Sequence, residues 1–167
     1  MQSNKSKGLL KCLAIAALGA TLGLSAGVSP AAGEKFVMVS HAPDSDSWWN
    51  TIKNAIKQAG EDFNVTVDYR NPPNGDLADM ARLIEQSAAR NYDGLIADIA
   101  DFSVLQKPLG TVVAKKIMLV TINSGTIAQS EQLKAIMHVG QPEYDAGLGA
   151  GKRAKEAGIK SFVCVNH

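Results

Sequence analysis

Residues 93–99 read DGLIADI, an apolar run of strand length that is interrupted only by Asp98 and by its first two residues. A helix is expected over residues 104–116, and a second apolar run, IMLVTI, follows at residues 117–122. Apolar runs without polar alternation are typical of strands buried on both faces of a parallel sheet. Two such runs joined by a helix predict a right-handed strand–helix–strand unit.

The same alternation continues on both sides of this unit. Further strands are expected at residues 35–40, 65–69, 135–139 and 161–165, and further helices begin at Ser47, after Asp76 and after Gln141-Pro142. Short links between these elements predict an α/β fold, a three-layer open parallel sheet covered by helices on both faces. Ligands bind such sheets at the carboxyl edge of the strands. This rule selects the loops at residues 40–47, 70–75, 98–103 and 123–126.

Residues 1–33 have the layout of a secretory signal peptide. Lys5, Lys7 and Lys11 precede an uncharged stretch rich in Ala, Leu and Gly, and small residues at 31–33 come just before Glu34. We expect cleavage at residues 31–33. The alternative is a membrane-spanning anchor, for which the most apolar part, residues 13–24, has about half the required length. Removal of the signal would leave Cys164 as the one cysteine, which predicts no internal disulfide and a buried side chain on the last strand.

The positive net charge of the chain comes from residues 1–33. Three of the 17 Lys and Arg lie in residues 1–33, which hold no acid, so the other 14 face 16 acidic residues and the balance is −2. A folded part without basic excess argues against nucleic-acid binding and against binding to an anionic membrane through net charge.

The first selected loop contains both tryptophans of the chain. Asp46, Ser47, Trp48 and Trp49 stand together, and flat indole faces suit the C–H face of a sugar while carboxylates accept hydrogen bonds from its hydroxyls. The alternative is that Trp48 begins the buried face of the helix and that Asp46 or Ser47 caps it. Trp49 would then point about 100° away around the helix axis and be free to contact a ligand.

Polar side chains also end the third and fourth strands. Asp98 and Asp101 could form an acid–base pair, although Asp101 equally suits a helix cap. Asn123 and Ser124 could bind the hydroxyls of a neutral polyol, or simply form a turn.

Other motifs are incomplete. Residues 147–152 (GLGAGK) lack the glycine and the Ser or Thr that a phosphate-binding loop requires. His41, His138 and His167 do not have the spacing of metal ligands. We therefore expect neither a cofactor nor a metal.

Several of these segments together resemble the type I periplasmic sugar-binding proteins, the ribose-binding-like solute receptors of ABC transporters. The resemblance covers about residues 35–167. It rests on residues 39–40 (VS) followed by 46–49 (DSWW), on 93–96 (DGLI), on 119–125 (LVTINSG), and on 139–141 (VGQ) with 144–147 (YDAG). It implies a periplasmic-binding-protein-like I fold in which two lobes close over one neutral sugar or polyol. It also implies a periplasmic location, a monomer, a membrane permease as partner, and no catalysis.

The resemblance further implies which residues contact the ligand. They are Asp46, Trp48, Trp49, Asp98, Asn123, Ser124, Asn166 and His167. The chain would comprise a signal peptide (1–33), an N-terminal lobe (34–140) and the beginning of a C-terminal lobe (141–167). Because these receptors are about twice as long, we expect this chain to bind a sugar weakly or not at all. Two alternatives remain: the sensor module of a sugar-responsive repressor, and an exported hydrolase that uses Asp98 or Asp101.

Overall fold

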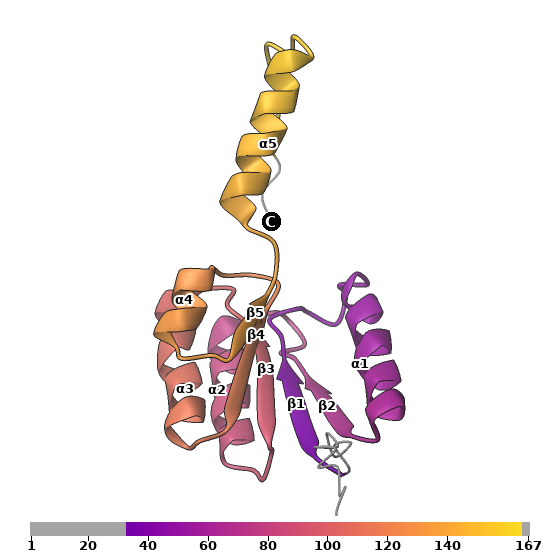
Figure 1. Cartoon of the computed structure of the whole chain (residues 1–167), viewed down its shortest axis with the longest axis vertical. Coiled ribbons are helices and arrows are strands. Elements are labelled where there is room, and N and C mark those ends of the chain that lie inside the picture. Colours follow the sequence, from indigo (N-terminus) through magenta and orange to yellow (C-terminus); the bar gives the residue numbers. More distant parts are fainter. Residues whose placement is uncertain (1–32, 165–167) are drawn as a thin grey trace, which may run out of the picture.

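The computed structural model describes residues 33–164. Strands and helices alternate along the chain as β1 (Lys35–Val39), α1 (Trp49–Phe63), β2 (Thr66–Arg70), α2 (Leu77–Ala88), β3 (Gly94–Asp98), α3 (Phe102–Ala114), β4 (Met118–Ile122), α4 (Ile127–Gln132), β5 (Met137–Val139) and α5 (Glu143–Glu156). The five strands are parallel and lie in the order β2-β1-β3-β4-β5. The sheet has α1 on one face and α2, α3 and α4 on the other (Figure 1). The predicted three-layer α/β fold is confirmed.

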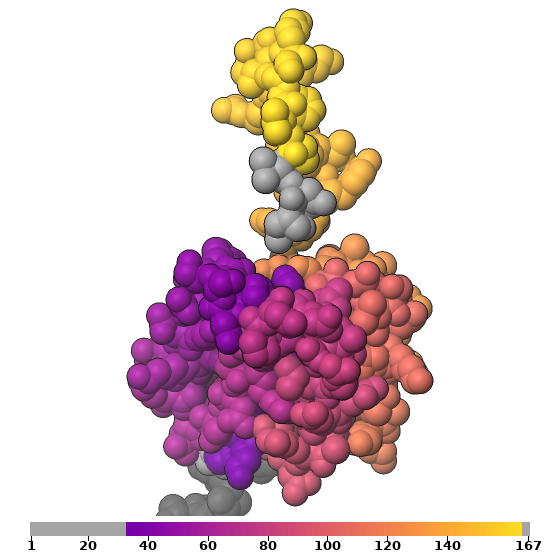
Figure 2. Space-filling model, turned by 180° about the vertical axis from the view of Figure 1, so that it is seen from behind, coloured from indigo at the N-terminus to yellow at the C-terminus, as the bar shows by residue number. Residues whose placement is uncertain are grey.

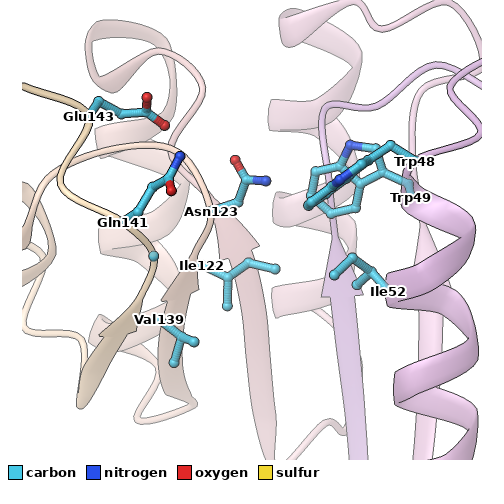
Figure 3. A pocket seen from close by; sticks show the side chains of 9 residues that line it. Trp48, Trp49, Ile52, Ile122, Asn123, Val139, Gln141 and Glu143 are labelled. Carbon is cyan, nitrogen blue, oxygen red and sulfur yellow. The ribbon is translucent and has the colours of Figure 1, made fainter. Parts of the chain in front are cut away.

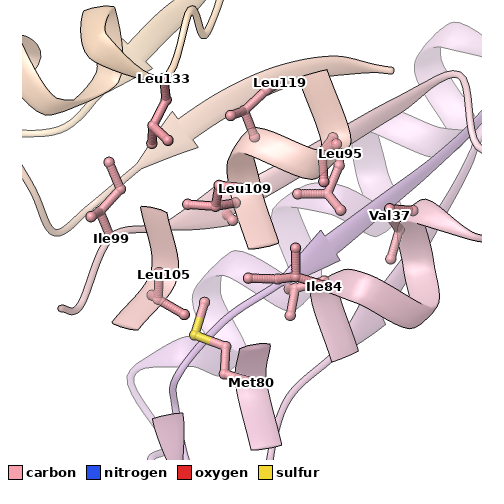
Figure 4. Packing of buried hydrophobic residues seen from close by; sticks show 13 residues of the cluster. Val37, Met80, Ile84, Leu95, Ile99, Leu105, Leu109, Leu119 and Leu133 are labelled. Carbon is pink, nitrogen blue, oxygen red and sulfur yellow. The ribbon is translucent and has the colours of Figure 1, made fainter. Parts of the chain in front are cut away.

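The main core lies between the sheet and helices α2 and α3. Alternate residues of β1, β3 and β4 point to this side and meet the apolar stripes of the two helices (Figure 4). Val37, Leu95, Leu105, Leu109 and Leu119 are at most 1% exposed. At 25–30 cal/mol per Å² of apolar surface, a fully buried side chain of this size contributes roughly 1.5–3 kcal/mol.

A smaller core holds α1 against the other face. Trp49, Ile52 and Ile56 pack there against Met38 of β1 and Ile122 of β4. Helix α1 covers the β1–β2 half of this face. On the β5 side of the same face, Met137 and Val139 remain 55% and 56% exposed.

Helix α5 stands clear of the sheet and its helices (Figure 2). None of its residues is buried, and its apolar side chains Tyr144 and Leu148 are 78% and 57% exposed. The link between β5 and α5 is residues 140–142, so the main chain leaves the sheet at the carboxyl end of β5. None of the helices within residues 33–164 combines the length and the apolar character that a membrane crossing requires.

Two expectations are wrong, and one helix was missed. Of the strand expected at residues 161–165, residues 161–164 are not a strand: they follow α5 and pair with no strand in the described part of the chain. Cys164 is therefore exposed rather than buried. Helix α4 was not expected, although Thr126 and Gln129 form a capping box at its start. The proposed signal peptide, apart from Gly33, lies outside the described residues.

Candidate ligand-binding site

An open pocket of about 550 Å³ lies at the carboxyl edge of the sheet, where the main chain crosses from β5 to α5. Three kinds of side chain line it (Figure 3): aromatic and apolar ones from the start of α1, apolar ones from the strand ends, and polar ones from Asn123 and the crossing segment. The lining residues are Trp48, Trp49, Ile52, Ile122, Asn123, Val139, Gly140, Gln141 and Glu143. One wall is thus apolar and aromatic, and the opposite wall carries two amides and a carboxylate.

The two tryptophans have exchanged the roles expected for them. Trp49 is 2% exposed and belongs to the core under α1, whereas Trp48 is 55% exposed. The reason is the helix phase: α1 begins at Trp49, which shares a face with Ile52 and Ile56 three and seven residues later. Trp48 precedes the helix as its N-cap residue and packs edge-on against Trp49, with ring centroids 5.4 Å apart. Both indoles still reach the pocket.

Asp46 supports the indole wall of the pocket by a hydrogen bond to the backbone. Its Oδ1 accepts a hydrogen bond from the backbone N–H of Trp48 at 3.0 Å, which fixes the turn into α1. The side chain is not among those that line the pocket.

Asp98 is buried rather than directed into the pocket. It is 0% exposed, its Oδ1 accepts the backbone N–H of His41 at 3.1 Å, and its Oδ2 pairs with Nδ1 of the His41 ring. That hydrogen bond is the largest cause of a raised pKa for His41. Burial lowers this pKa, and the charges of Asp98 and Asp46 raise it. His41 is therefore the partner of Asp98. His41 was not among the residues expected to bind a ligand.

Asn123 lies on the pocket wall in a conformation that few residue types adopt. Its φ of 55° is left-handed, which Asn tolerates better than most residues. Its backbone N–H donates to the carbonyl of Val139 at 2.9 Å, and this bond ties the end of β4 to the end of β5. Ser124 supports it, because the hydroxyl of Ser124 donates to Oδ1 of Asn123 at 3.0 Å. Ser124 itself does not line the pocket.

Of the six predicted contacts that can be located, the structure brings Trp48, Trp49 and Asn123 into the pocket. Asn166 and His167 lie outside the described residues. The sequence analysis missed Gln141 and Glu143, although Gln141 directly follows the Val139-Gly140 pair at which the resemblance placed the crossing. Residues 33–164 contain no group of three His, Cys, Asp or Glu side chains that could hold a metal ion.

Comparison with solved structures gives several with the same fold. A carbohydrate transporter from Acidothermus cellulolyticus 11B, solved in complex with myo-inositol, is 33% identical with a TM-score of 0.72, and the match covers 77% of this chain and 44% of that one. An arabinose-binding protein from Geobacillus stearothermophilus is 27% identical with a TM-score of 0.62, covering 75% and 42%. A sugar-binding protein of a sugar ABC transporter from Bacillus halodurans is 25% identical with a TM-score of 0.64, covering 74% and 41%. The chain therefore spans less than half the length of these structures.

No curated protein matches the chain significantly. A family model described as a periplasmic binding protein domain matches residues 36–165, which span all the strands and helices described above except Lys35, the first residue of β1. The chain therefore belongs to the periplasmic binding protein domain family, in agreement with its resemblance to the type I sugar-binding receptors.

Proposed function

We propose that the chain is the substrate-binding component of an ABC-type importer and binds a neutral sugar or polyol in this pocket without catalysis. The observation that carries the proposal is the division of the pocket into an indole wall, Trp48 and Trp49, and a facing polar wall of Asn123, Gln141 and Glu143. A sugar ring has the matching division, with apolar C–H faces and a rim of hydroxyls.

The lining also favours a neutral ligand over an anionic one. None of the nine lining residues that the structure describes is a Lys or Arg, and Glu143 contributes a carboxylate. A sugar phosphate or a carboxylate ligand would meet this acidic group without a cationic partner. The names of two solved relatives include uncharged ligands, myo-inositol for one and arabinose for the other.

The site gives less support to a hydrolase. Asp98 is completely buried and paired with His41, and Asp101 is the N-cap of α3, accepting from the backbone N–H of Ser103 at 2.8 Å. Both carboxylates that could have formed an acid–base pair already have structural partners. The proposal therefore includes no chemical step.

The same proposal covers the division of the chain into lobes, its location and its partner. Residues 34–140 form the N-terminal lobe of a receptor and residues 141–167 begin a second lobe, with the ligand between the two. Export by a signal peptide in residues 1–33 would place a monomeric receptor in the periplasm, where its partner is a membrane permease.

The test uses the two tryptophans, because the chain has two and both line this pocket. Indole N–H signals of the ¹⁵N-labelled full chain are followed by NMR during titration with myo-inositol, arabinose, glucose and galactose, and with a sugar phosphate as the charged comparison. We expect a saturable shift of the indole signals with at least one neutral sugar. A response to the sugar phosphate alone, or none to any neutral sugar at tens of millimolar, would contradict the proposal. Recovery of the sugar unchanged after prolonged incubation tests the absence of catalysis.

A further inference from the structure

His41 lies between the buried carboxylate of Asp98 and the indole wall of the pocket. Its Nδ1 and its backbone N–H both contact the Asp98 carboxylate. Its ring also lies against Trp49, at 5.8 Å between centroids and with an interplanar angle of 89°. Since Trp48 packs edge-on against Trp49, three aromatic rings follow one another from Asp98 to the pocket.

Two members of this row, Asp98 and Trp49, are almost completely buried. Asp98 is 0% exposed and Trp49 is 2% exposed. A carboxylate in such a position is costly unless it is paired, so the His41 ring is held where Asp98 needs it. The same ring is the surface against which Trp49 rests. A weaker interaction between Asp98 and His41 would therefore weaken the contact that keeps Trp49 in place.

The charged and titratable groups around His41 come from four parts of the chain. Asp98 ends β3, and Asp46 lies in the loop that His41 itself belongs to. Behind them, the hydroxyl of Tyr69 on β2 hydrogen-bonds with Ser40, and Nζ of Lys53 on α1 lies 4.9 Å from the centre of the Tyr69 ring. Both acids that act on His41 raise its pKa, and the Asp98 hydrogen bond is the larger effect, so the imidazole stays protonated to higher pH than a free histidine.

We propose that His41 is a positioning residue for the ligand pocket: the charged His41–Asp98 pair fixes Trp49, and loss of the His41 proton loosens the indole wall and weakens ligand binding. The neutral imidazole can still donate one hydrogen bond to Asp98, but the pair then lacks the charge that makes such bonds strong. The ligand part of this inference, the expected effect on ligand binding, rests on the proposed function. The positioning part, the effect of His41 on the position of Trp49, does not.

The positioning part is tested without ligand by the intrinsic fluorescence of the full chain between pH 5 and pH 9. A protonated imidazole next to an indole quenches its emission, so we expect emission to rise as His41 loses its proton, with a midpoint above 6.5. His41→Gln keeps a hydrogen-bond donor for Asp98 but cannot titrate, and it should abolish the transition. Asp98→Asn keeps the size of the side chain without its charge, and it should lower the midpoint by about one unit or more.

His138→Gln is the matched control, because it removes the other described histidine, on β5, and should leave the midpoint unchanged. A wild-type chain without a transition, a transition that survives in His41→Gln, or a midpoint that Asp98→Asn does not lower would overturn the proposal.

The ligand part is tested by the Kd of the sugar identified above, measured at pH 6 and pH 9. We expect the wild-type chain to bind about twofold to tenfold more weakly at pH 9, the range that one aromatic contact supplies, and His41→Gln to bind equally at both values. Equal wild-type affinity at the two pH values would overturn the pH effect. Absence of sugar binding at either pH would instead contradict the proposed function, while the fluorescence titration would still decide the role of His41.

Discussion

Trp48 packs edge-on against Trp49 at an interplanar angle of 80°, and the two rings differ in exposure from 55% to 2%. One indole is thus part of the core and the other is presented to the pocket. The adjacent residues should respond in opposite ways to truncation, which separates ligand contact from stability.

Trp49→Ala should destabilise the fold by about 3–5 kcal/mol, since it removes a large buried side chain from under α1. Trp48→Ala should cost no more than about 1 kcal/mol and should mainly weaken sugar binding. Urea unfolding followed by far-UV circular dichroism measures the first effect, and the NMR titration measures the second. Equal loss of stability in the two variants would contradict the assignment of Trp49 to the core.

The His41–Asp98 pair should also make stability depend on pH. A raised pKa in the folded state means that the folded protein binds the proton more tightly than the unfolded chain does. The stabilisation is complete below pH 6.5, the ordinary value for histidine, and is lost as pH rises through the higher folded-state value. The free energy of unfolding should therefore fall between pH 6 and pH 9, and less steeply in His41→Gln. Identical slopes for the two chains in urea unfolding would be evidence against this pairing.

Gly140 should not tolerate a side chain. A Cβ there would lie 2.6 Å from the carbonyl oxygen of Asn123 and 2.6 Å from Nε2 of His138, so the crossing segment would have to move. We expect Gly140→Ala to destabilise the fold by about 1–3 kcal/mol and to disturb the indole N–H signals. Gly147→Ala is the control, because a Cβ at Gly147 meets nothing within 4 Å and α5 lies apart from the body. Its unfolding midpoint should equal that of the wild type.

Affinity for any sugar should be low in this chain, with a Kd in the millimolar rather than the micromolar range. The pocket has walls from α1 and from the crossing segment, but α5 buries no residue and contributes Glu143 alone. Receptors of this kind close two lobes over the ligand, and closure requires contacts that favour the closed state. Titration calorimetry that gave a micromolar Kd for the chain would contradict this prediction.

The sequence predicted β1, β3, β4 and β5 from short apolar runs and β2 from the alternation in residues 65–69, and the parallel arrangement followed from the helices between the strands. It could not give the phase of α1. Residues 44–48 form a turn that Asp46 stabilises, so the helix begins later than the apolar spacing from Trp48 suggested. Helix α1 begins at Trp49, two residues after the expected start at Ser47, and Trp49 rather than Trp48 is the buried tryptophan.

The residues of the pocket were predictable where they end a strand or begin a helix, as for Asn123 and Trp48. Asp98 was correctly placed at the end of β3, but its side chain turned inward because His41, 57 positions away, offered a partner. Such pairings depend on how loops meet in space, which the local sequence does not specify. Residues 161–164 show the same limit, since an apolar run becomes a strand only beside another strand.

Gly140 lies at the junction about which helix α5 would rotate relative to the sheet. Helix α5 has 14 residues and is about 21 Å long, and it is joined to the sheet through this one residue without a side chain and the two that follow it. Each degree of rotation at the junction would sweep the far end of the helix through about 0.4 Å, by simple geometry from that length. Because Gly140 also lines the pocket, the point about which α5 would rotate lies beside the proposed ligand site. A rotation of about three degrees at the junction would thus move the far end of α5 by about 1 Å.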